Sequence, residues 1–467
     1  MLRSFVAKCL SEYGMVVVLV LLCAYYAWAT LERRAGVGTA GGDDCASQLL
    51  AKLPAAKYVV IIAGHDSDDA AFIQAAKTRL EKGGVASIDV VDGEPPIARK
   101  SLLEIIAGGK RPDAILSTAA CGEWLPRVLD RLPSLSAVPV ITPGAYRWPT
   151  FLTSSNLLNV ANQIVVIAVM AVGMTMVIIT GGIDLSVGSL VALSAVVTAM
   201  LIRDHAGGAN ASASGMIGCS LVGVLVCGAV GAFSGGMITL FNVPPFITTL
   251  AMMQVASGLA YILAAGQSIY DIPSSFTWLG RGIGALGIPN AVWLMLAVFA
   301  VAHITMSRTR LGRYIYAVGG NAEAARLSGV RVGRVLMIAY IISGLAAGLG
   351  GVIVASQLKS SSPTYGLSYE LYVIAAVVVG GTSLAGGEGN IIGTLIGALI
   401  MAVIQNGMNL TGVEGYRQKV VLGFVILGAV LLDRLKRRSW RFPFWIQRSA
   451  PRPVEVVESA ATNLTAE

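Results

Sequence analysis

The chain has 467 residues, of which 55% are hydrophobic and only 13% are charged. Soluble domains usually carry about a quarter charged residues, so this composition indicates a membrane protein. The net charge of +8 comes from Lys and Arg at helix ends and after Asp433, as cytoplasmic anchors do, and it does not predict a nucleic-acid partner. Because His65, His205 and His303 are far apart, no metal-ligand spacing is present, and we expect no cofactor.

The first apolar run is Tyr13 to Ala29, and Arg3 and Lys8 precede it. These charges predict a cytoplasmic N-terminus and a transmembrane helix within residues 1–35. Ala27-Trp28-Ala29 resembles a signal-peptidase site, so a cleaved signal is the alternative.

Residues 36–147 are charged and contain no run long enough to span a bilayer. Short apolar strands alternate here with amphipathic helices, which predicts a small α/β domain with a parallel sheet. The strands are expected at 58–63, 87–91, 113–117 and 138–142, and the helices at 68–82, 97–107 and 123–131. Cys45 and Cys121 lie in this exposed region, where a disulfide is permitted, but their distance apart cannot be read from the sequence.

Residues 148–438 are almost entirely apolar and predict a polytopic helical membrane domain. With the first helix we expect about ten transmembrane helices, which places both termini and the basic loop 307–334 in the cytoplasm. Residues 439–467 are then a cytoplasmic tail, and the α/β insert is extracytoplasmic. The nine later spans are expected near 157–179, 185–202, 214–240, 246–265, 289–306, 335–356, 369–384, 390–408 and 418–433.

A Gly-Gly-Ile-Asp-Leu-Ser sequence interrupts the apolar run around Asp184. An ionisable group and irregular backbone at membrane depth normally face a protein interior or a pathway. The stretch 177–196 is echoed by 377–400, which also has Gly-Gly, a short polar segment and a glycine-rich helix, and such pairs point to a pathway. The alternatives are that Asp184 caps the next helix, and that glycine-rich helices look alike by composition. The expected pathway residues are Gly181, Gly182, Asp184, Ser186, Gly380, Gly381 and Ser383.

The loop between the sixth and seventh spans contains a short capped helix. Asn321 is its expected N-cap and Gly329 its C-terminal stop. The surrounding arginines can be explained by the positive-inside rule alone, but the small residues of this helix suit insertion into a groove of a partner. A bulky charged residue at Ala325 is therefore expected to uncouple the partner from transport. The expected contact residues are Asn321, Ala322, Glu323, Ala324, Ala325, Arg326, Leu327 and Gly329.

Six stretches between Phe151 and Asp433 resemble the permease subunit of bacterial ribose-type (simple sugar) ABC importers. They are FLTSSNLLNVANQ, GMTMVIITGGIDLSVGS, VPPFITTLAMM, TRLGRYIYAVGGNAEAARLSGV, a long stretch beginning at Tyr369, and the last span. The resemblance implies a second permease copy, a cytoplasmic ABC ATPase that meets residues 321–330, and an extracytoplasmic sugar-binding protein. Tyr372 stands where the family usually has Asp, and Ser234-Gly235 where it often has Asn-Gly, which leaves the sugar open.

The insert more weakly resembles one lobe of a sugar-binding protein, through ARKSLLEIIAGGKRPDAILST. His65, Asp66 and Asp68 follow its first strand, where a ligand could bind, but a sugar is normally clamped between two lobes. A docking or structural role is the alternative.

Together these features predict a monosaccharide permease of the bacterial inner membrane. The sequence has no Gly-x-x-x-x-Gly-Lys-Ser/Thr phosphate loop, so ATP hydrolysis is assigned to a separate chain and this chain is not expected to be an enzyme. The alternatives are import of a branched-chain amino acid or nucleoside, or a membrane receptor that senses a ligand through the insert.

Overall fold

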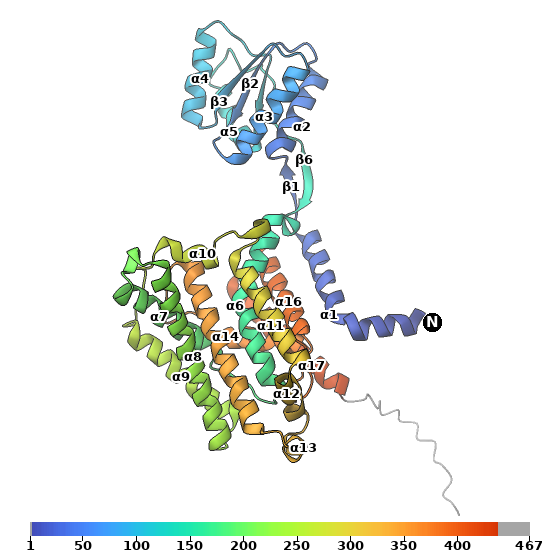
Figure 1. The fold of residues 1–467 in the computed structure, drawn as a ribbon. Coiled ribbons are helices and arrows are strands. Elements are labelled where there is room, and N and C mark those ends of the chain that lie inside the picture. The colour runs from blue at the N-terminus through green and yellow to red at the C-terminus, as the bar shows by residue number, and fades with distance from the viewer. Residues whose placement is uncertain (1, 438–467) are drawn as a thin grey trace, which may run out of the picture.

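The computed structural model describes residues 2–437, so the predicted tail at 439–467 lies outside the described residues. An α/β unit is joined by a two-stranded ribbon to a bundle of helices (Figure 1).

The ribbon and the helix before it connect the two units. Helix α1 (Leu2–Ala29) leads into β1 (Leu31–Ala35), which pairs antiparallel with β6 (Ala145–Pro149). Thr30 accepts the backbone N–H groups of Thr150, at 3.0 Å, and of Phe151, at 3.1 Å through its hydroxyl. The ribbon was not predicted, and it brings the two ends of the α/β unit together at one point of the bundle.

The α/β unit has a parallel sheet at the positions that the sequence predicted. The strands are β2 (Tyr58–Ala63), β3 (Ser87–Asp92), β4 (Ala114–Ser117) and β5 (Val140–Ile141), in the order β3-β2-β4-β5. The helices are α2 (Gly38–Lys52), α3 (Ser67–Lys82), α4 (Pro95–Ala107) and α5 (Ala119–Leu129). α2 was not predicted, because its polar N-terminal half lacks a continuous apolar face. It packs with α3 on one face of the sheet, while α4 and α5 cover the other.

The two cysteines of this unit belong to different cores. Cys45 packs with α2 and α3, whereas Cys121 packs with α4 and α5 on the opposite face of the sheet. Both thiols are free, which settles the question of a disulfide between them. Burial raises the pKa of Cys121, and burial together with Asp44 raises the pKa of Cys45 to about 12.

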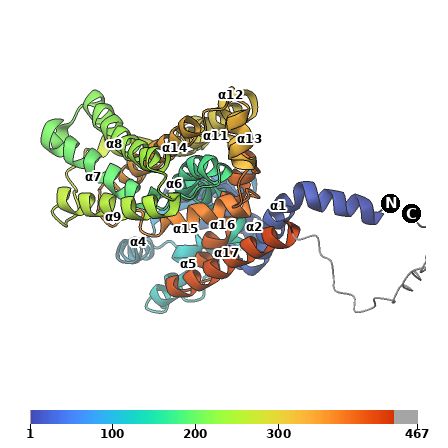
Figure 2. The same ribbon diagram turned by 90° about the horizontal axis from the view of Figure 1, so that it is seen from below.

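Seven helices of the described chain are long and apolar enough to cross a membrane, and α6 lies near the middle of the bundle (Figure 2). The chain is therefore a polytopic helical membrane protein. The seven are α6 (Ser154–Ile179), α7 (Val187–His205), α8 (Ala213–Leu240), α9 (Pro245–Leu263), α11 (Asn290–Arg308), α14 (Val332–Leu358) and α16 (Ile391–Leu410). The shorter helices are α10 (Thr277–Gly280), α12 (Arg310–Gly320), α13 (Ala322–Leu327) and α15 (Tyr369–Val379), and α17 (Gly415–Arg437) ends the described chain. Single 3-10 turns lie at Thr150–Leu152, Gly208–Asn210, Ser274–Phe276 and Ala285–Gly287.

Glycines allow the long helices to approach closely, as the high glycine content predicts. A methyl group on Gly231 of α8 would lie 2.3 Å from the carbonyl oxygen of Tyr340 on α14. One on Gly344 of α14 would lie 2.3 Å from the carbonyl oxygen of Cys227 on α8. Small residues on both helices thus bring the two backbones into contact, which is how membrane helices gain packing energy.

Candidate functional site

The two glycine-broken segments, residues 177–196 and 377–400, contain the same backbone turn. At the end of α6, the N–H of Gly181 donates to Ile178 O at 2.9 Å, and that of Gly182 to Val177 O at 3.1 Å. At the end of α15, Gly381 and Thr382 make the same two bonds, to Val378 and Val377, at 2.9 and 3.1 Å. Gly181 and Gly381 both have φ +84, a left-handed conformation that favours glycine. The span expected at 369–384 therefore ends at Val379, and the sequence echo corresponds to a repeated structure.

Asp184 lies in the interior of the bundle with both carboxylate oxygens hydrogen-bonded. Oδ1 accepts the backbone N–H of Ser186 at 3.0 Å and its hydroxyl at 2.6 Å. Oδ2 accepts the hydroxyl of Ser343, on α14, at 2.7 Å. Asp184 and Ser186 are each 1% exposed, so both side chains lie inside the protein. A buried carboxylate needs such partners, because leaving it unpaired costs several kcal/mol.

The contact with Ser343 also places Asp184 well inside the bundle. Ser343 is the twelfth of the 27 residues of α14, about 16 Å from the start of the helix at 1.5 Å per residue. The capping alternative is only partly right, because the N-cap of α7 is Ser186, and the Asp184 side chain bonds to the N–H of that residue.

The two broken segments meet each other. The backbone N–H of Gly387 donates to the carbonyl of Ile179, the last residue of α6, at 2.8 Å. Ser383 is 1% exposed, and its hydroxyl accepts the N–H of Ala385 at 3.1 Å, as Asp184 does from Ser186. Five of the predicted residues are therefore buried beside this junction, namely Gly182, Asp184, Ser186, Gly380 and Ser383, whereas Gly181 and Gly381 are exposed.

Sequence analysis missed two side chains of α14 in this region. One is Ser343, which bonds to Asp184. The other is Tyr340, whose hydroxyl group is buried and has no hydrogen-bond partner among the described residues. A methyl group on Gly182 would lie 2.4 Å from that hydroxyl oxygen, so the phenol lies directly over the first break. A serine and a tyrosine in an apolar run carry little signal in a single sequence.

Helix α13 forms where it was predicted. The Asn321 side chain accepts the N–H of Ala324 at 2.9 Å, and Gly329, at φ +87, ends the helix. Glu323 and Arg326 form an exposed ion pair at 2.5 Å. Leu327 is 80% exposed, whereas Ala325 is 5% exposed and packs into the bundle. The methyl group of Ala325 therefore faces the permease itself, and uncoupling by a bulky charged residue at this position stays a prediction.

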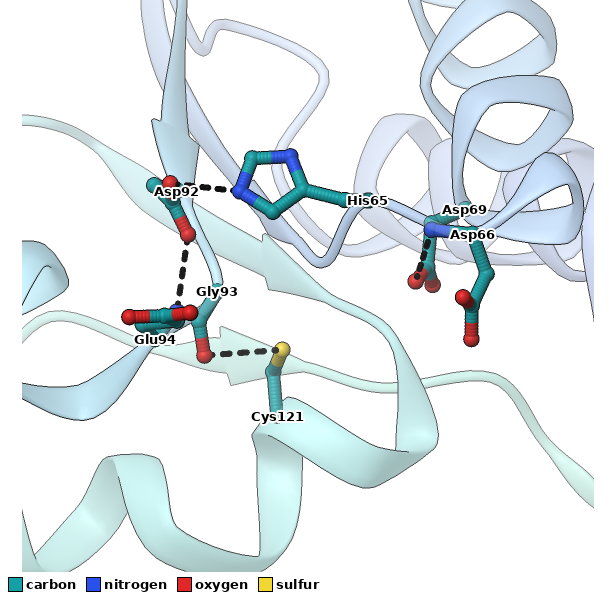
Figure 3. Close-up of polar contacts among 7 residues, drawn as sticks. All are labelled: His65, Asp66, Asp69, Asp92, Gly93, Glu94 and Cys121. Carbon is teal, nitrogen blue, oxygen red and sulfur yellow. Dashed lines mark hydrogen bonds and ion pairs between the residues drawn. The ribbon is translucent and has the colours of Figure 1, made fainter.

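A polar cluster lies at the carboxyl ends of the strands in the α/β unit (Figure 3). His65 Nε2 lies 2.8 Å from Asp92 Oδ2, and Asp92 Oδ1 accepts the N–H of Glu94 at 2.9 Å. The side chain of His65 is 74% exposed. Asp66 and Asp69 form the capping box of α3, which gives these two carboxylates a structural role. Within residues 2–437 no group of three His, Cys, Asp or Glu residues could hold a metal ion.

The fold and the broken helices define a multi-pass membrane protein of the transporter class. Residues 156–430 match the family model described as branched-chain amino acid transport system / permease component. The chain belongs to this permease family, and ATP hydrolysis is the task of a separate partner chain.

Individual relatives show the same membership. The ribose import permease protein of Escherichia coli strain K12 is 46% identical over 293 residues, which are 62% of this chain and 88% of that protein. The ribose import permease protein of Bacillus subtilis strain 168 is 45% identical over 290 residues, 62% of this chain and 87% of that protein. The D-allose transport system permease protein of Escherichia coli strain K12 is 39% identical over 299 residues, 64% and 89% of the two chains. No solved structure matches the chain.

Proposed function

We propose that this chain is the membrane-spanning permease subunit of an ABC importer that carries a monosaccharide, of the ribose, xylose or galactose kind, across the bacterial inner membrane. The observation that carries the proposal is the 46% identity to a ribose import permease along 88% of its length. Other relatives are named for D-allose and L-arabinose, so the common substrate class among them is a simple sugar.

The proposed topology has ten transmembrane segments with both termini in the cytoplasm. Besides the seven long helices it counts α1, α17 and the segment that contains α15. Two contacts support α1 as a retained helix: the ring of Tyr26 packs on Gly407 of α16, and its hydroxyl donates to Ile404 O at 3.4 Å. The α/β unit lies at the end of the bundle opposite α13 (Figure 1). A cytoplasmic α13 therefore favours an extracytoplasmic insert.

The proposed pathway passes the two broken segments, and α13 is the proposed contact with the ATPase. Exposed Leu327 beside the Glu323–Arg326 pair supports this role, because an apolar side chain at the tip of a polar loop suits burial in a partner. A second permease copy and an extracytoplasmic sugar-binding protein complete the proposed assembly. The insert is proposed to modulate docking or capture by that binding protein.

Uptake of labelled sugars tests the function. The chain is expressed with its ATPase and binding protein in cells that lack their own pentose and hexose importers, and ribose, xylose, galactose, allose and arabinose are compared. Leucine and a nucleoside are included, because the family description names branched-chain amino acids. We expect uptake of at least one sugar and none of leucine. Leucine or nucleoside uptake without sugar uptake would contradict the proposal, and ligand binding without any uptake would favour the receptor alternative.

The ribbon offers a clean way to remove the insert. Ala35 and Ala145 are directly opposite each other, so an Asn-Gly turn can replace residues 36–144 and close the ribbon as a hairpin. We expect this variant to retain uptake but to need a different concentration of binding protein. Complete loss of uptake with normal membrane assembly would assign the insert to the core machinery. A tag in the insert that is protected from protease in spheroplasts would overturn the topology.

A further inference from the structure

Helix α12, which directly precedes the coupling helix α13, contacts both broken segments at its C-terminal end. Gly319 makes the closest approach: a methyl group there would lie 1.7 Å from the carbonyl oxygen of Ile179 and 2.6 Å from the backbone nitrogen of Gly387. These are the two atoms that bond the broken segments to each other at 2.8 Å. The backbone of α12 therefore rests on the hydrogen bond that joins the two segments.

A second contact comes from a side chain of the same helix. The hydroxyl of Tyr316 donates to the carbonyl of Gly389, in the second broken segment, at 2.8 Å. Gly386 adds a third approach, since a methyl group there would lie 2.9 Å from Gly319 O and 3.1 Å from Gly181 N. Three segments far apart in sequence thus meet through backbone atoms, and little slack remains between them.

The polypeptide continues without a gap from this junction into α13. Asn321 is both the C-cap of α12 and the N-cap of α13, and Ala325 anchors α13 to the bundle. Interiors that are this closely packed transmit displacement instead of absorbing it. A push on exposed Leu327 would accordingly reach the two broken segments together.

We propose that α12 transmits movement of α13 to both broken segments, with Tyr316 and Gly319 as its positioning residues. The proposal rests on the proposed function, in which α13 meets the ATPase. It assigns the transmission of movement to the backbone junction that Gly319 makes with Ile179 and Gly387.

The test measures sugar transported per ATP hydrolysed, in proteoliposomes that contain the complete transporter. Tyr316→Phe keeps the aromatic ring and removes only the hydrogen bond to Gly389. Because one hydrogen bond is worth about 1 kcal/mol, we expect the transport ratio to fall about fivefold while ATP hydrolysis persists. Tyr314→Phe is the matched control, since Tyr314 is 41% exposed on the same helix, and its ratio should not change. If the Gly319→Ala variant folds, it should lower the amount of sugar transported per ATP further. If it does not fold, the result for Tyr316→Phe alone tests the proposal.

An unchanged ratio in Tyr316→Phe, or a proportional loss of both activities, would give these residues a merely structural role and overturn the proposal. Leu327→Asp separates this failure from failure of the proposed function. If Leu327→Asp uncouples ATP hydrolysis from transport and Tyr316→Phe does not, only the role proposed for α12 is wrong. If Leu327→Asp leaves coupling intact, the assignment of α13 itself is wrong.

Discussion

The hydroxyl group of Ser343 should stabilise the permease more than an otherwise matched serine does. Ser343 and Ser194 are both 0% exposed, and each donates one hydrogen bond of 2.7 Å. They differ in the acceptor, which is the Asp184 carboxylate for Ser343 and the Gly348 carbonyl for Ser194. The pair isolates the effect of the charge on the acceptor.

The expected magnitudes follow from this difference. A hydrogen bond to a charged group contributes about 1.5 to 3 kcal/mol, against about 0.5 to 1.5 kcal/mol for a neutral acceptor. Hydrogen bonds between membrane helices average only about 0.6 kcal/mol, which lowers both figures. We therefore expect Ser343→Ala to cost about 2 kcal/mol and Ser194→Ala about 1 kcal/mol or less.

The assay is reversible unfolding in mixed micelles, with the free energy of unfolding obtained from a titration with sodium dodecyl sulfate. The same two substitutions are then made in an Asp184→Asn background, where the charge is absent. There the two serines should cost about the same. Equal costs in the wild-type background would refute the reasoning, because Asp184 would then not accept a charge-assisted bond from Ser343.

Three further outcomes are expected. Leu327→Asp should weaken docking of the ATPase about tenfold or more, because burying a leucine is worth about 1.5 to 3 kcal/mol. Co-purification measures this docking, and normal docking would argue against this surface. Maleimide should label Cys45 at pH 8 only after unfolding, since a pKa of about 12 leaves roughly a thousandfold less thiolate than an ordinary thiol has. Rapid labelling of the native protein would contradict the buried position of Cys45. The N–H groups of Tyr58 and Lys57 lower the pKa of Asp113, so its contribution to the stability of the insert is full above the usual carboxyl pKa and is lost as the pH falls through the lowered value. Asp113→Asn should remove this acid-dependent loss in pH-dependent unfolding, and an unaltered pH profile would contradict it.

The features predicted well from the sequence are those fixed by neighbouring residues. Asn321 and Gly329 bound α13 because a side-chain cap and a left-handed glycine act within one helical turn. The strands of the insert were found for a similar reason, since a buried parallel strand such as Tyr58–Ala63 is a short continuous apolar run.

The features that were missed depend on distant partners or on the direction of a side chain. Ser343 lies 159 residues from Asp184, and one sequence contains nothing that pairs them. The ribbon joins Leu31 to Pro149 across the whole insert, in a charged segment without a clear alternation. The burial of Ala325 was not predicted, because a six-residue helix is too short for its buried side to be read from periodicity.

The two broken segments lie between these cases, and they show how local and distant information combine. The echo between 177–196 and 377–400 predicted only that both segments leave a helix at a glycine pair, which the identical turns at Gly181 and Gly381 explain. It did not predict the hydrogen bond from Gly387 to Ile179. A turn sets the direction in which its own segment continues, but it does not determine which other segment packs against it. The same junction requires glycine at position 319 of α12, because a larger side chain there would collide with both segments. A residue that the junction requires to be small therefore lies outside the repeat, in the helix that leads to the proposed coupling contact.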